Sequence, residues 1–272
     1  KGRKIIDLKK NNLHVVNYSA PVNKTMSSRE LDKYLYSIKE KPNTIPYVTS
    51  YYKRKFGFCL EHNKRKKLKD KSCQVVIDSK FINGNVINGI AKIKGKTKKT
   101  ILISSYLCHP SMANNELSGP LTLVGLYHKI KKWKNRQFSY LFLINPETIG
   151  SICYLSNHLE FLRKNLDSGL VLTCLGGPEK KLSFKKSRMG NSSLDKIFSN
   201  LYKEGNVRLR NFDPTEGSDE RQYCSSELNL PVGQVVRTGY FNYPQYHTSA
   251  DNKKFMKISQ VIKSINEIEN IL

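Results

Sequence analysis

The stretch "TILISSYLCHPSMANNELSGPLTLVGLYHKIKKW", residues 100–133, decides the fold class of this chain. It opens with an apolar run at residues 100–107, which has the length of a strand buried on both faces. From Gly119 onward, apolar residues recur at helical spacing. A histidine, two asparagines and a glutamate lie between the two patterns, where a strand ends and a helix begins. Ligand sites of α/β sheets lie at such ends.

The alternation of strand and helix patterns continues towards the C-terminus. Strand-like segments are "FSYLFLIN" (138–145), "GLVLTCL" (169–175), "VRLRNF" (207–212) and "PVGQVVR" (231–237). Helix-like segments are "GSICYLSNHLEFLRKN" (150–165), "NSSLDKIFSNLYKE" (191–204) and residues 253–272. Strands that alternate with helices predict an α/β fold with a central, mostly parallel sheet flanked by helices on both faces.

The N-terminal part of the chain has a different pattern. "SSRELDKYLYSI" begins with a Ser27–Glu30 capping box, and short strand-like pieces follow it. "CQVVIDSKF" (73–81) and "GNVINGIAKIKG" (84–95) flank the turn signal Asn83-Gly84 and predict a hairpin. We therefore expect a small inserted α+β domain at residues 10–95 and an α/β domain at residues 96–272, to which residues 1–9 belong.

The composition excludes several classes of protein. The net charge is +25, but the basic clusters lack interleaved aromatic residues and no nucleic-acid-binding motif is present, so we do not expect a nucleic-acid partner. No apolar run reaches the ~18 residues of a membrane span. The six cysteines have no C-x-x-C spacing, which favours a reduced, cytoplasmic protein.

Polar residues follow several of the predicted strands. His109 and His247 lie in strand-end loops and are candidate zinc ligands, although hydrogen-bonded loop histidines are the alternative. Glu147 stands between a strand and a helix start, where it could bind a metal, act as a general base, or simply be an acidic residue at a helix N-terminus. Asp219 and Arg221, in "GSDERQY", have a solvated helix start as their alternative interpretation.

Seven segments together carry a family resemblance. They are "IPYVTSYYKRKFGFCLEHN", "YLCHPSMANNELSGP", "NPETIGS", "CLGGP", "KKSRMGNS", "GSDERQYCS" and "YPQYHTSADN". In this order they resemble the aminopeptidase-like proteins of bacterial polysaccharide-biosynthesis loci, which belong to the zinc exopeptidase clan. The resemblance covers nearly the whole chain. It implies a zinc-exopeptidase-like α/β fold with a small inserted domain.

The resemblance also implies a metal site from which this chain departs. Co-catalytic members of the clan bind two zinc ions, and His109 and His247 match their first and last histidines. Three expected acidic residues are replaced, by Asn115, Pro146 and Gly177, and Glu116 is only next to an expected position. We therefore expect one zinc ion at most, held by His109 and His247 with Glu147 or Asn115, and the alternative is a chain that binds none.

The function implied is metal-dependent hydrolysis of an amide bond in a peptide or an N-acylated amino sugar. Glu147 would transfer the proton. Asp219, Arg221, Arg188 and Tyr246 would orient the substrate. The alternative is a catalytically inactive exopeptidase-fold protein that binds a glycan or amino-sugar ligand.

Overall fold

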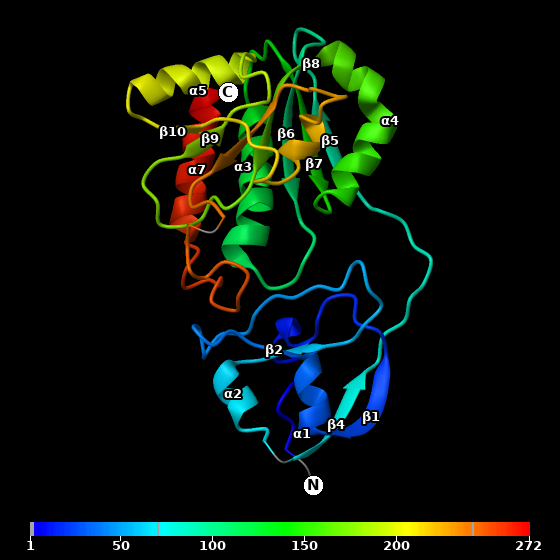
Figure 1. Cartoon of the computed structure of the whole chain (residues 1–272). Helices are drawn as coiled ribbons and strands as arrows, with labels where there is room; N and C mark the ends of the chain where they lie inside the picture. The colour runs from blue at the N-terminus through cyan, green and yellow to red at the C-terminus, as the bar shows by residue number, and fades with distance from the viewer. Residues whose placement is uncertain (1–2, 70, 241) are drawn as a thin grey trace. The chain divides into compact units, whose positions relative to one another are not determined.

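The computed structural model describes residues 3–69, 71–240 and 242–272, and the chain divides into two compact units (Figure 1). The first unit consists of Lys1–Gly84, His109–Met112 and Gln245–Asn252. The second unit consists of Asn85–Cys108, Ala113–Pro244 and Lys253–Leu272. Within the described residues, no helix is both long enough and apolar enough to cross a membrane.

The second unit is built on a seven-stranded sheet, counted over the described residues. In spatial order its strands are β10 (Arg208–Arg210), β9 (Ser183–Lys185), β11 (Val232–Val236), β8 (Leu166–Leu172), β6 (Thr100–Tyr106), β7 (Ser139–Asn145) and β5 (Gly89–Ile93). The pairs β11–β8, β8–β6, β6–β7 and β9–β10 are parallel, whereas β5–β7 and β9–β11 are antiparallel. The predicted mostly parallel α/β fold is confirmed.

Helices cover both faces of this sheet (Figure 1). They are α3 (Ser118–Lys131), α4 (Ile149–Asn165), α5 (Ser193–Lys203), the short α6 (Glu220–Tyr223) and α7 (Ile258–Ile271). Side chains alternate between faces along β6: Ile101 and Ile103 pack in the core cluster that contains residues of α3, α5 and α7. Leu102, between them, packs in the cluster that contains residues of α4. Burial on both faces explains why the β6 sequence is apolar at consecutive positions.

The first unit contains short elements around its own core. They are η1 (Asn12–His14), β1 (Val22–Ser27), α1 (Ser28–Leu31), η2 (Asp32–Tyr34), β2 (Leu35–Tyr36), β3 (Phe58–Cys59), α2 (His62–Lys66) and β4 (Ser72–Ile77). β1 pairs antiparallel with β4, and β2 pairs parallel with β3. The expected capping box is present, because Ser27 and Glu30 exchange hydrogen bonds at the start of α1.

The predicted hairpin around Asn83-Gly84 is wrong. β4 pairs with β1 of the first unit, whereas β5 pairs with β7 at the edge of the large sheet. Each strand follows its apolar side chains: Val75 and Ile77 of β4 are buried in the core of the first unit. Ile93 of β5 is buried with Tyr140 in the core of the second. Residues 89–93, which we placed in the inserted domain, therefore belong to the second unit.

Candidate functional site

His109 and His247 come together in the first unit. Their ring centroids are 5.4 Å apart with an interplanar angle of 84°. Tyr47 stacks on the His109 ring at 4.3 Å and meets the His247 ring edge-on at 5.1 Å. The Tyr47 N–H donates to the backbone oxygen of His247 at 2.9 Å. The Tyr47 ring therefore packs against both imidazoles, and its backbone is hydrogen-bonded to that of His247.

The electrostatic environment favours neutral imidazole at His247. Burial, with a smaller contribution from the neighbouring His109, lowers the pKa of His247 to about 4. A neutral imidazole is the form that ligates a metal. The backbone of His247 is in the left-handed region, with φ 50°, and Tyr246 stacks on its ring at 3.9 Å. The donor chemistry of this pair fits zinc, although two histidines alone do not complete a zinc site.

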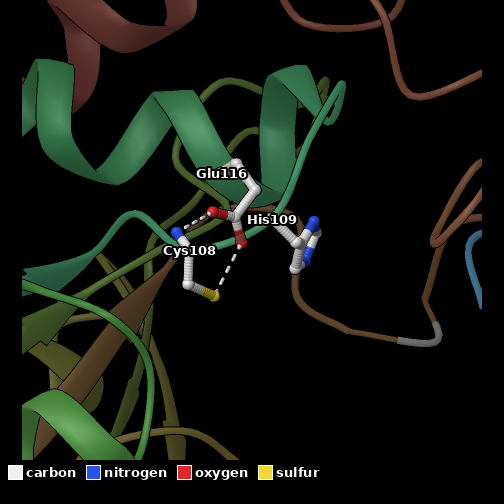
Figure 2. Close-up of side chains that lie close together, drawn as sticks. All are labelled: Cys108, His109 and Glu116. Atoms are coloured by element: carbon white, nitrogen blue, oxygen red, sulfur yellow. Dashed lines mark hydrogen bonds between the residues drawn. The ribbon is translucent and has the colours of Figure 1, made fainter. Parts of the chain in front are cut away.

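Figure 2 shows Cys108 and His109 of the loop that follows β6 and Glu116 of the π-helical turn after it, three residues of types that can hold a metal ion. The Cys108 N–H donates to Glu116 Oε2 at 2.7 Å, and its thiol donates to Oε1 at 3.8 Å. Burial, and then the Glu116 carboxylate, raise the pKa of the Cys108 thiol. A thiol must lose its proton to bind zinc, and this environment keeps the proton on Cys108 in the metal-free chain.

Asn115 is buried in the second unit, in the π-helical turn η3 (Ala113–Leu117). Its amide nitrogen donates to the Tyr106 hydroxyl at 2.7 Å and to Cys174 Sγ at 3.8 Å. The side-chain amide thus holds the turn against the end of β6. Its role as a metal ligand stays a prediction.

Gly177 has no room for the aspartate that the family resemblance implies at this position. A Cβ atom on Gly177 would lie 2.3 Å from Thr238 Oγ1 and 2.4 Å from Thr238 Cβ. A carboxylate here would require Thr238 to move. The packing of Thr238 therefore fits glycine at this position and leaves no space for the expected aspartate.

In the second unit, the segment that contains Ser218 and Asp219 forms hydrogen bonds with Glu147 and with residues near it. The Ser218 hydroxyl donates to Glu147 Oε1 at 2.6 Å. Asp219 Oδ1 accepts from the Thr148 N–H at 2.7 Å and from Ser151 Oγ at 3.0 Å. Asn145 Nδ2 donates to Asp219 Oδ2 at 2.9 Å. Ser218 and Asp219 therefore position the Glu147 carboxylate and the residues around it.

The backbone next to Glu147 is strained. Thr148 has φ 64°, a left-handed conformation that a β-branched residue rarely adopts. Such strain persists where neighbouring groups over-determine it, and it clusters at functional sites. Here the Thr148 N–H is fixed by Asp219 and α4 begins at the next residue.

Burial raises the pKa of Asp219 from 3.8 to about 6, because it outweighs the three hydrogen bonds that favour the carboxylate. An acid whose pKa is raised on folding destabilises the folded state as pH rises from the unfolded pKa through the folded one. We therefore expect this group to lower the free energy of unfolding by roughly 2 kcal/mol between pH 4 and pH 7.

Urea unfolding of the parent and of Asp219→Asn at both pH values measures this contribution. The difference in unfolding free energy, parent minus variant, should be smaller at pH 7 than at pH 4. A difference that stays constant or grows with pH would show that Asp219 is ionised as easily in the folded chain as in the unfolded one.

The other predicted substrate-binding residues belong to different segments of the chain. Arg221 is half-buried, and its Nε donates to the Ser218 backbone oxygen at 3.3 Å. Arg188 is exposed, in the segment between β9 and α5. Tyr246 belongs to the first unit, beside His247. Substrate contacts by Asp219, Arg221, Arg188 and Tyr246 stay predictions.

Lys185 and Glu220 form a buried ion pair that the sequence analysis missed. Their side chains are 1% and 0% exposed, and Lys185 Nζ lies 2.5 Å from Glu220 Oε1. Glu220 also accepts from the Ser218 N–H and from Gln234 Nε2. Lys185 Nζ donates to the backbone oxygens of Asp213 and Glu216. The pair fixes the loop that carries Ser218 and Asp219. In the sequence, the feature that could have indicated this ion pair is the lysine at the end of "LSFK" (182–185).

The comparisons with known proteins agree with this fold. The family model described as "Domain of unknown function (DUF4910)" matches residues 10–272. A Clostridium acetobutylicum protein, provisionally named a polysaccharide biosynthesis protein with aminopeptidase-like domain, is 44% identical over 258 residues, which are 94% of this chain. The chain spans only 58% of that relative's length.

Many solved structures are similar to the chain, and two of them come from C. acetobutylicum and Bacillus subtilis. A crystal structure of a provisionally identified peptidase from C. acetobutylicum matches with a TM-score of 0.94 and 40% identity, over 99% of this chain and 63% of the other. A zinc aminopeptidase from Bacillus subtilis matches with a TM-score of 0.63 and 14% identity, over 87% of this chain and 62% of the other. The second likeness shows the fold alone. The resemblance found in the motifs is confirmed, and the chain belongs to the DUF4910 family and has an aminopeptidase-like fold.

Proposed function

We propose that the chain is a zinc-dependent hydrolase that cleaves an amide bond in a peptide or in an N-acylated amino sugar. The observation that carries the proposal is the pair of adjacent imidazoles of His109 and His247, in a chain with an aminopeptidase-like fold. In this proposal the two histidines hold one zinc ion, and Glu147 or Asn115 supplies a further ligand. Zinc, when bound, acts as a Lewis acid on the carbonyl and lowers the pKa of water.

Glu147 has the role of proton-transfer group in this proposal. Its carboxylate would take a proton from the attacking water and deliver it to the leaving nitrogen, as general acid–base catalysis requires. The hydrogen bond from Ser218 to Glu147 Oε1 would keep the carboxylate in one orientation. Asp219 would act on Glu147 indirectly, by fixing the strained backbone at Thr148.

A second candidate function is ligand binding without catalysis. The packing of Thr238 against Gly177, and the use of the Asn115 amide by Tyr106, favour it. Asn115 and Gly177 stand where the family resemblance implies acidic ligands for a two-zinc site, and these contacts fit the residues that are present. A chain of this kind would bind a glycan or amino sugar and would show no turnover with any added metal.

Zinc binding tests the histidine pair without any assay of activity. After removal of metal, titration calorimetry with zinc should show at most one tightly bound ion per chain. His247→Ala should weaken zinc binding by at least about 100-fold, because one of only two imidazole ligands is lost. His128→Ala removes an exposed histidine of α3 and should leave the affinity unchanged.

Two tightly bound zinc ions per chain would contradict the one-ion expectation. Equal zinc affinities of the parent and His247→Ala would contradict the assignment of the ligands. Both results leave the question of turnover to a separate measurement.

A further inference from the structure

A second candidate ligand site lies in the first unit and does not include the histidine pair. It is a surface cleft of about 280 Å³, lined by Tyr18, Ser50, Tyr51, Arg54 and Phe81. We call these five residues the aromatic cleft. Its volume is close to the lower end of the ~300–1,000 Å³ that is usual for small-molecule pockets, so it suits a single ring with its substituents.

The aromatic cleft has three partly exposed aromatic rings. Tyr18, Tyr51 and Phe81 are 55%, 54% and 50% exposed, and the centroids of the two tyrosine rings are 4.9 Å apart. Tyr18 also has a left-handed backbone, with φ 63°, a conformation that bulky residues seldom adopt. Grouped, half-exposed aromatic rings mark binding surfaces more often than single exposed apolar residues do.

Backbone and side-chain hydrogen bonds hold the walls of the aromatic cleft together. The Asn17 N–H donates to the Val48 oxygen at 3.0 Å, and the Ser50 N–H donates to the Asn17 oxygen at 3.1 Å. Ser79 Oγ donates to the Ser19 oxygen at 2.8 Å. The three segments that supply the rings are thus tied to one another. A ligand would meet walls that are already placed, which lowers the entropic cost of binding.

Arg54 gives the aromatic cleft its charge. Its guanidinium carbon lies 4.3 Å from the centroid of the Phe81 ring. Among the residues that the structure describes, no carboxylate lies within salt-bridge distance of this guanidinium. The next residue, Lys55, directs its Nζ to the Tyr36 hydroxyl at 3.2 Å. The guanidinium is therefore available to an anionic group of a ligand.

We propose that the aromatic cleft binds an acidic sugar, a pyranose ring that carries a carboxylate or a phosphate. The C–H faces of a pyranose pack well on tyrosine rings, and a guanidinium matches a carboxylate or phosphate with two parallel hydrogen bonds. Single-stranded nucleic acid also stacks on aromatic rings, but it needs a basic groove that follows its backbone over several nucleotides. A cleft of this volume with one guanidinium in its lining favours the sugar.

Titration calorimetry on the full chain tests the proposal with defined probes. The first probe is a tetrasaccharide with alternating glucuronate residues, and its neutral counterpart is cellotetraose. UDP-glucuronate, with UDP-glucose as its control, tests whether the sugar is recognised when linked to a nucleotide. We expect the acidic tetrasaccharide or UDP-glucuronate to bind at least about tenfold more tightly than its control, because only the acidic probe offers a sugar carboxylate to Arg54.

Variants locate the binding. Tyr51→Ala and Arg54→Ala should each lower the affinity for the acidic probe by about tenfold, the range expected for stacking and for a lost charge-assisted contact. Tyr202→Ala and Arg29→Ala remove an exposed tyrosine and an exposed arginine outside the cleft and should leave the affinity unchanged. Thermal unfolding midpoints equal to that of the parent would show that all four variants fold.

Several results would overturn the proposal. They are the absence of binding by both acidic probes, equal affinity for acidic and neutral sugars, and equal losses in Arg29→Ala and Arg54→Ala, which would indicate attraction to the overall charge. Tighter, Tyr51-dependent binding of an oligothymidylate would assign the aromatic cleft to nucleic acid. Binding of the tetrasaccharide alone supports a polymer-borne sugar, and binding of UDP-glucuronate alone supports a nucleotide-linked one.

Discussion

Replacing Glu147 by glutamine is expected to lower amide hydrolysis by about 10²–10⁴-fold, the range that general acid–base catalysis contributes. The substitution keeps the shape of the side chain, and an amide oxygen still accepts the hydrogen bond from Ser218. The change in folding stability should be small, because a carboxylate before the N-terminus of a helix such as α4 contributes only ~0.3–1 kcal/mol. Turnover and thermal unfolding of the same preparations measure both effects.

A matched control is available on α4, the helix that follows Glu147. Glu160 is an exposed residue of α4, and Glu160→Gln should leave turnover unchanged. Ser218→Ala should give an intermediate loss, because it removes the group that orients Glu147 but not the base itself. Equal turnover by the parent and Glu147→Gln would eliminate the role assigned to this carboxylate.

Replacing Lys185 by methionine is expected to destabilise the chain by about 3–5 kcal/mol, the usual effect of removing one partner of a buried ion pair. The charge on Glu220 would remain in a site where both side chains are almost completely buried. The backbone oxygens of Asp213 and Glu216 would also lose their donor. The free energy of urea unfolding at neutral pH measures the loss.

Two further variants test the cause. Lys186→Met changes the next lysine, which is only half-buried, and should change the free energy of unfolding by less than about 0.5 kcal/mol. Lys185→Met combined with Glu220→Leu should regain part of the lost stability, because no uncompensated charge is left. A loss in Lys185→Met no larger than in Lys186→Met would mean that the ion pair contributes little.

The sequence predicted the central fold well because the pattern and the packing agree there. The apolar segment at residues 100–107 became β6, whose side chains are buried on both faces. The short β9, in contrast, was missed, because three residues that include a lysine resemble no buried strand. The last helix begins at Ile258 instead of residue 253, since the segment before it is not helical.

Local signals failed where distant contacts decide the structure. Asn83-Gly84 is a strong hairpin signal, but the strands on either side of it are buried in different cores. Local sequence signals were also insufficient for the candidate site. The positions of Glu147, His109 and His247 after predicted strands indicated that they are site residues. The sequence did not indicate that Glu147 bonds to Ser218 or that Glu220 pairs with Lys185, because these partners are far apart in the chain.

We propose that the chain hydrolyses an amide bond with the help of zinc held by His109 and His247. The most direct test is the turnover of a panel of dipeptides and N-acetylated amino sugars by the chain with zinc, after chelation, and after zinc is restored. We expect turnover of at least one substrate, loss on chelation, recovery with zinc, and no recovery in His247→Ala. Turnover that survives chelation and the His247→Ala substitution, or no turnover of any substrate with zinc, cobalt or manganese, would contradict it.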